Sequence, residues 1–183
     1  MNRIAVYFII ALPQLLMAGQ STAPSTYSGE ESRVIKSLSE QEIEALQNGD
    51  GMGFAKAAEL NHYPGPRHVL DLSDKLGLTA SQQSRTRALY EDMRETAIPV
   101  GQELLRAEGD LDLLFSHGGV SFVSLEANLN TIGRLRAKLR FIHLEAHLRQ
   151  INILDSSQVE KYDLLRGYQP HTLHHDSEIH GNN

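Results

Sequence analysis

The sequence predicts an all-α fold, a hooked antiparallel hairpin of two long helices flanked by shorter helices. Apolar residues recur at the spacing of a helix over two long stretches, one from Leu78 to about Phe115 and the other from Ser121 to Ile153. Tryptophan is absent and aromatic residues are scarce, which favours a helical protein over a sandwich or barrel. The short turn between the two stretches predicts that the helices are antiparallel neighbours.

The second long stretch is the element on which the functional hypothesis depends. Its predicted apolar stripe consists of Leu125, Leu129, Ile132, Leu139, Ile142 and Ala146. His143 and His147 are four residues apart beside this stripe, so they lie one turn apart on the same side of a helix. Two imidazoles in that arrangement can share one metal ion.

The N-terminal region predicts export. Residues 1–20 combine a basic start, an apolar run and small residues, which is the pattern of a secretory signal peptide. An uncleaved membrane anchor is the alternative interpretation. Residues 21–38 are expected to be a linker, and the absence of cysteine means that the exported domain is held together by packing without disulfides.

Helix start and stop signals divide the rest of the chain, and residues 39–168 form one predicted helical domain. Ser39 with Glu42 makes a capping box for a short helix that ends at Gly49. A second short helical run is expected over 54–60, and a rigid loop with two prolines is expected over 61–68. A third helical run over 69–76 is expected to end at Gly77.

Both the first long helix and the last helix begin with the same five-residue pattern. In LTASQ, Leu78 to Gln82, Thr79 is the expected N-cap and Gln82 reaches back to it; in LDSSQ, Leu154 to Gln158, Asp155 takes the place of the threonine. Pro99 predicts a kink in the first long helix, and not a break, because the apolar stripe continues in phase. The last helix is expected over 156–166, followed by a disordered, His-rich tail over 169–183.

These two motifs, flanking a helical hairpin behind a signal peptide, resemble the Spy/CpxP family of periplasmic LTxxQ-motif proteins and its heavy-metal-sensor branch, typified by CnrX. The resemblance covers roughly residues 60–168, and only the first motif matches LTxxQ in full. It implies a periplasmic helical hairpin that forms a homodimer. It also implies one of three roles: chaperoning unfolding envelope proteins, repressing a membrane-bound stress sensor, or binding a transition metal as a signalling input.

The metal-sensing branch implies a ligand set for this chain. His143 and His147 match the spacing of the family's His-x-x-x-Met pair, with histidine in place of methionine, which favours Zn, Ni, Co or Cu(II) over Cu(I). Glu59, His62 and His68 are the expected ligands from the earlier part of the chain, although the family spacing is not reproduced there. The alternative is that His143 is a satisfied residue at the helix edge and His147 a surface residue.

Other residues fit other roles. The tail histidines either hold metal loosely or belong to a solvated terminus; they are His171, His174, His175 and His180. The long helices also carry a basic surface that could hold acidic or unfolding proteins. The residues that make it are Arg85, Arg87, Arg94, Arg134, Arg136, Lys138, Arg140 and Arg149.

Composition and motifs narrow the class of protein. The formal net charge of -6 makes nucleic acid an unsuitable partner. An enzyme is not expected, because there is no cysteine, no recognisable Ser-His-Asp set and no phosphate-binding loop after a strand. The sequence therefore predicts a periplasmic heavy-metal-binding protein in metal sensing or resistance, with an envelope chaperone or stress-response regulator as the alternative.

Overall fold

The computed structural model describes residues 24–168, and every regular element in this range is a helix. The chain divides into two compact units, residues 1–31 and 32–183, and every α-helix of the described range lies in the second unit. A 3-10 helix, Glu30–Ser32, lies at the boundary between the units. The predicted signal peptide and the predicted tail lie outside the described residues. Between residues 24 and 168, no helix has the length and apolar character needed to cross a membrane.

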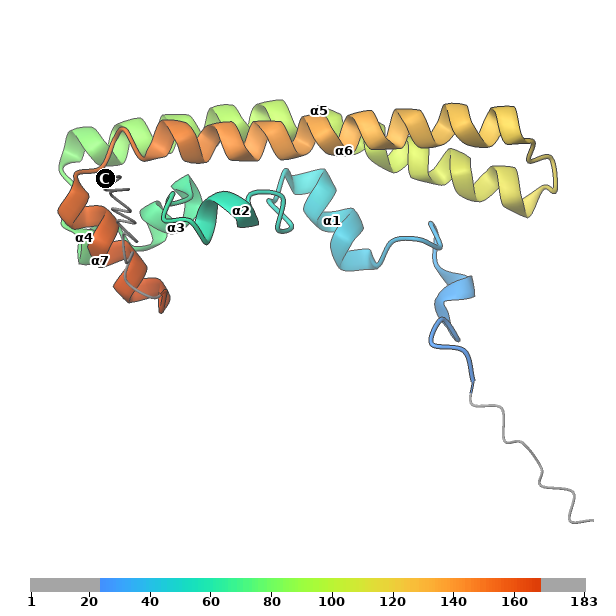
Figure 1. The fold of residues 1–183 in the computed structure, drawn as a ribbon, viewed down its shortest axis with the longest axis horizontal. Coiled ribbons are helices and arrows are strands. Elements are labelled where there is room, and N and C mark those ends of the chain that lie inside the picture. The colour runs from blue at the N-terminus through green and yellow to red at the C-terminus, as the bar shows by residue number, and fades with distance from the viewer. Residues whose placement is uncertain (1–23, 169–183) are drawn as a thin grey trace, which may run out of the picture. The chain divides into compact units, whose positions relative to one another are not determined.

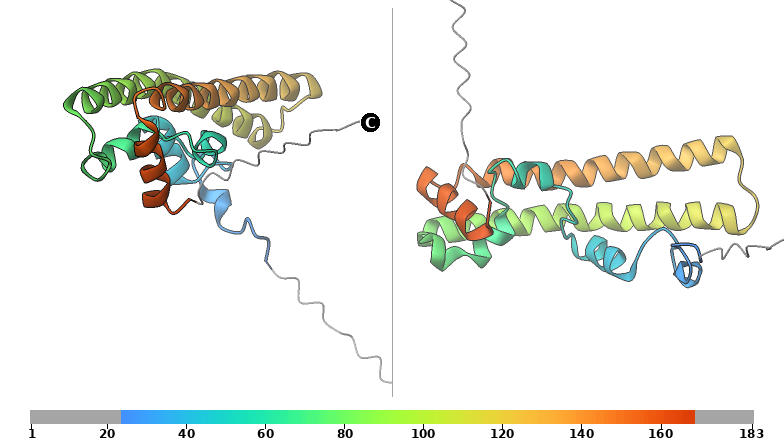
Figure 2. Two further views of the ribbon diagram at one scale, coloured as in Figure 1. Left: turned by 60° about the vertical axis from the view of Figure 1, so that its left-hand side comes forward. Right: turned by 60° about the horizontal axis from the view of Figure 1, so that its bottom comes forward.

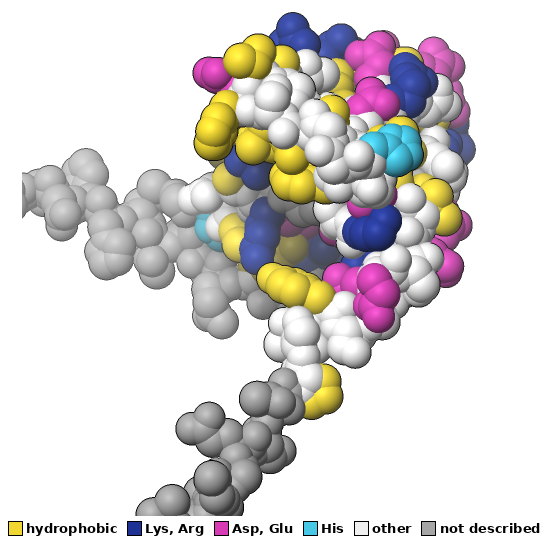
Figure 3. Space-filling model, turned by 90° about the vertical axis from the view of Figure 1, so that its right-hand side faces the viewer, with side chains coloured by type: hydrophobic (Ala, Val, Ile, Leu, Met, Phe, Trp, Pro, Cys, Tyr) yellow, Lys and Arg dark blue, Asp and Glu magenta, His cyan; other side chains and the backbone are white. Residues whose placement is uncertain are grey.

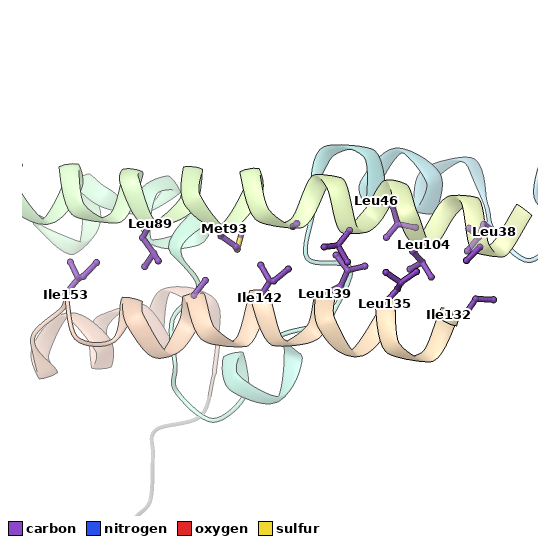
Figure 4. Close-up of a cluster of buried hydrophobic side chains, with 14 residues drawn as sticks. Leu38, Leu46, Leu89, Met93, Leu104, Ile132, Leu135, Leu139, Ile142 and Ile153 are labelled. Atoms are coloured by element: carbon purple, nitrogen blue, oxygen red, sulfur yellow. The ribbon is translucent and has the colours of Figure 1, made fainter. Parts of the chain in front are cut away.

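Two long helices, α5 (Ala80–Ser116) and α6 (Phe122–Gln150), form the predicted antiparallel hairpin (Figure 1). Helix α5 runs through Pro99 without a break. Leu89 and Met93 of α5 point toward α6, where they meet side chains such as Ile142 (Figure 4). The all-α hairpin is therefore confirmed, and its core lies along the seam between the two helices.

The apolar stripe of α6 is only partly buried. Ile132, Leu139 and Ile142 are in the core, whereas Leu129, nearer the hairpin turn, is 48 % exposed. Two helices packed only on each other cannot cover both of their apolar faces. This explains why apolar side chains near the turn remain exposed. Hydrophobic side chains gather at this end (Figure 3). The exposed ones are Leu113, Phe115, Val120, Phe122, Val123 and Leu129, here called the apolar tip.

Helix α1 (Glu40–Asn48) packs on α5 through a close backbone contact. Its predicted capping box is present, and Gly49 ends it with a φ of 70°. A Cβ atom on Gly101 would overlap the Leu46 carbonyl, so only glycine allows this approach. The packed domain also begins before Ser39, because Leu38 is buried and the Lys36 ammonium lies 2.9 Å from Asp112.

The remaining helices pack near the end of the hairpin opposite the turn (Figure 2). They are α2 (Lys56–Glu59), α3 (Pro66–Asp71), α4 (Ser73–Leu76) and α7 (Ser156–Arg166). Val69, Leu76 and Tyr162 belong to a second buried cluster there. The expected loop over 61–68 is too long, because α3 already begins at Pro66, a residue favoured at the first position of a helix.

Candidate metal centre

His143 and His147 are both buried on α6, on the side covered by the 50–66 segment. Their exposed fractions are 3 % and 9 %. The alternative interpretation is therefore wrong for His147, which is not a surface residue. A buried imidazole costs free energy unless its ring nitrogens find partners, so the surroundings of each ring decide what it can do.

The His143 ring is held in an apolar environment. It stacks on Phe54 with ring centroids 5.9 Å apart, and a Cβ on Gly51 would lie 3.7 Å from Nδ1. Burial lowers the pKa of His143 to about 4, with a further contribution from His147, so the ring is neutral at pH 7. Within residues 24–168, nothing forms a hydrogen bond with its buried Nε2 atom.

The tautomer of neutral His147 follows from its hydrogen bond. Its Nδ1 atom lies 2.7 Å from the carbonyl oxygen of Tyr63, and because a carbonyl can only accept, Nδ1 carries the proton. The neutral ring then has its lone pair on Nε2. A backbone carbonyl bonded to the far nitrogen is also the usual arrangement behind a metal-ligating histidine.

Gly65 lies in close contact with the edge of this ring. A Cβ on Gly65 would lie 2.9 Å from His147 Nε2 and 3.5 Å from Glu59 Oε2. Glu59 Oε2 itself is 3.8 Å from His147 Nδ1. At 2.9 Å a Cβ would overlap the ring, so glycine at position 65 allows His147 and Glu59 to pack close together here.

The carboxylate of Glu59 is anchored through one oxygen only. Its Oε1 atom accepts hydrogen bonds from the hydroxyls of Tyr162, at 2.5 Å, and Tyr168, at 2.9 Å, and Arg166 Nε lies 3.4 Å away. Burial, followed by the bond to Glu59, raises the pKa of Tyr162, so this hydroxyl stays a donor. No described residue forms a hydrogen bond with the buried Oε2 atom.

The other two expected ligands have different partners. His62 Nδ1 lies 2.7 Å from Asp163 Oδ2, on the side of α7. His68 is 41 % exposed at its side chain and lies 3.7 Å from Asp71. The structure thus brings Glu59 to His147 but directs His62 and His68 elsewhere.

The donor chemistry fits a metal, whereas the donor geometry is incomplete. Two imidazole nitrogens and one carboxylate oxygen suit Zn, Ni, Co or Cu(II). In the described part of the chain, however, no three His, Asp or Glu side chains converge on one point. Binding at His143, His147 and Glu59 would therefore require side-chain movement.

Sequence reasoning missed the groups that orient these donors. Tyr63 acts through its backbone carbonyl, which no side-chain pattern reveals, and Tyr162 reaches Glu59 from a helix far along the chain. The sequence did contain a signal for Gly65. It stands between two prolines, and a glycine there indicates a position where a Cβ is not tolerated or not needed.

The predicted basic surface is partly neutralised by ion pairs. Arg136 lies 2.5 Å from the buried carboxylate of Glu108, and Arg149 lies 2.7 Å from Asp92. Both pairs join α6 to α5. These two arginines therefore serve contacts within the hairpin.

Comparisons of the chain with known protein families, with curated proteins and with solved structures find no match.

Proposed function

We propose that this chain is an exported, periplasmic protein of the LTxxQ type that binds a first-row transition metal ion in metal sensing or resistance. The proposed ligands are His143, His147 and Glu59, and the metal is Zn, Ni, Co or Cu(II). One observation carries the proposal: the Nε2 atom of His147 lies near the same edge of Gly65 as the Glu59 oxygen that has no hydrogen-bond partner among the described residues.

The protonation state of the ligands supports this proposal. Metal ligation needs neutral imidazoles, and the lowered pKa of His143 provides one at any pH near neutrality. The Tyr63 carbonyl fixes the proton of His147 on Nδ1, which leaves the lone pair on Nε2. A cation would also give a partner to two buried atoms, His143 Nε2 and Glu59 Oε2, that have none among residues 24–168.

The hydrogen bonds of Glu59 would transmit the effect of metal binding to α7. Tyr162 and Tyr168 lie in and just after α7, and both donate to Glu59 Oε1. A metal bound through Oε2 would therefore link α2, α6 and α7. A membrane-bound signalling partner that contacts α7 would sense that change.

Calorimetric titration with Zn(II), Ni(II), Co(II) and Cu(II) tests the proposal. The titration uses the full chain with the four tail histidines replaced by glutamine, so that the tail does not contribute. We expect one ion per chain to bind with a dissociation constant below about 100 μM, equivalent to more than about 5 kcal/mol. His147→Gln should weaken binding at least about tenfold, because a neutral nitrogen ligand is lost.

His117→Gln is the matched control, since His117 follows α5 at the hairpin turn, away from these donors. It should leave the dissociation constant unchanged. Failure to bind any of the four ions, or equal binding by the His147 variant, contradicts the proposal.

The apolar tip favours a second candidate, a chaperone or stress-response regulator that binds unfolding envelope proteins. Phe122 and Val123 are 93 % and 78 % exposed, which is unusual for side chains of this size next to each other. The same surface would also serve the proposed homodimer. Metal-independent suppression of aggregation of a urea-diluted client, lost in Phe122→Ser with Val123→Ser, would support this candidate and no suppression would remove it.

A further inference from the structure

A second site lies between α7 and the segment before α3. It is a pocket of about 770 Å³, a size typical of small-molecule sites. Much of its wall is apolar, from Ile151, Leu154, Val159 and Leu164. Tyr63 and Tyr168 add aromatic surface, so the pocket can accept an alkyl or aromatic group.

The charged groups of the pocket have one sign. Asp155, Glu160 and Asp163 line it, and the wall residues within 24–168 include neither lysine nor arginine. Besides the tyrosines, the other ionisable group that the described residues bring to the wall is His62, which contacts Asp163 Oδ2. An acidic, apolar pocket attracts a cation that carries hydrocarbon.

Asp163 provides a specific atom that a cation could contact. The residue is 6 % exposed, and while Oδ2 meets His62, its buried Oδ1 atom has no hydrogen-bond partner in the described part of the chain. A buried carboxylate oxygen without a donor is costly, and an ammonium group is the donor that suits it best.

His62, in the pocket wall, has an unusual backbone conformation. Its φ of 66° is left-handed, which is costly for a residue with a side chain. The His62 ring contacts Asp163 at the pocket wall.

We propose that this pocket binds a small organic cation, an amine or ammonium group on an apolar chain. The ammonium group donates to Asp163 Oδ1, and the apolar chain packs on Val159 and Leu164. This inference does not depend on the metal proposal, because it uses neither His143 nor His147.

The test is a calorimetric titration of the full chain with three probes of the same length: octylammonium, octanoate and octanol. We expect octylammonium to bind with a dissociation constant below about 1 mM. Octanol should bind at least about tenfold more weakly, because it lacks the charge-assisted bond. Octanoate should not bind, because its charge repels Asp163 and Glu160.

Variants of the wall locate the binding site. Asp163→Asn should weaken octylammonium binding at least about tenfold. Leu164→Arg places a cation at a position that is 70 % exposed, so the fold is kept while the pocket loses its charge preference. Asp74→Asn makes the same charge change on the exposed part of α4 and should have no effect.

Equal affinity for octylammonium and octanol, or undiminished binding by the Leu164 variant, would overturn the inference. Absence of octylammonium binding would overturn it as well.

Discussion

Gln82 and Gln158 hydrogen-bond each other in both directions, with donor to acceptor distances of 2.8 and 3.1 Å between their side-chain amides. Each is also the third residue of its helix, where its oxygen accepts from the N-cap backbone of Thr79 or Asp155. The two repeated motifs therefore meet in space, and the pair ties the start of α5 to the start of α7.

Replacing Gln82 by alanine should lower the free energy of unfolding by about 1 to 3 kcal/mol, because the Gln158 amide loses its partner in a half-buried place. Urea denaturation measures the change. Ser84→Ala, on the exposed face of α5, should change stability by less than about 0.5 kcal/mol.

The double variant Gln82→Ala with Gln158→Ala should lose less free energy of unfolding than the two single variants lose together. Either single change already breaks the hydrogen bonds between the two side chains, so they cannot be lost a second time. Additive costs would show that the reciprocal bonds are not formed in solution.

Gly101→Ala should destabilise the protein by about 1 to 3 kcal/mol, because the new Cβ would force the Leu46 carbonyl of α1 away from α5. Gly109→Ala is the matched change in the same helix, where a Cβ meets nothing within 4 Å. It should stabilise by up to about 1 kcal/mol through higher helix propensity. Thermal melts followed by circular dichroism compare the two variants. Equal changes in stability would mean that α1 does not pack closely on Gly101.

The stability of the metal-free protein should fall as the pH drops from 6.5 to 4. The unfolded chain protonates His143 near pH 6.5, whereas the folded protein keeps it neutral down to a pKa of about 4 because the ring is buried. Within this window the unfolded state binds the extra proton, so acid favours unfolding. The contribution reaches about 3 kcal/mol at pH 4, since a tenfold change in proton affinity is worth about 1.4 kcal/mol.

His143→Gln removes this group, so urea denaturation of the variant should show a shallower loss of stability between these pH values. Its Phe54 neighbour and the other acid-sensitive groups remain unchanged. Identical pH profiles for the variant and the unsubstituted chain would mean that folding does not lower the pKa of His143.

Local signals predicted most of the fold. The capping boxes at Ser39, Thr79 and Asp155 are all present, and the left-handed glycines Gly49 and Gly77 end their helices as expected. These features depend on residues within one turn of each other, which a sequence displays directly. The exposure of Leu129 was not predictable in this way, because burial on α6 depends on which parts of the chain pack over it.

The candidate site was less predictable. The spacing of His143 and His147 placed both on one face, and Glu59 was expected near them and lies 3.8 Å from His147. His62 and His68 were expected there too, but Asp163 and Asp71 take them as partners. A sequence shows which residues are able to ligate, whereas competing contacts from distant helices decide which ones face the site.

The metal centre is tested most directly by two-dimensional NMR of the histidine ring nitrogens in the full chain, recorded before and after addition of one equivalent of Zn(II). We expect the Nε2 signals of His143 and His147 to move to the metal-bound position, while His147 Nδ1 stays protonated on the Tyr63 carbonyl. Changes confined to the four tail histidines, with both α6 rings unaltered, would contradict the proposed metal centre.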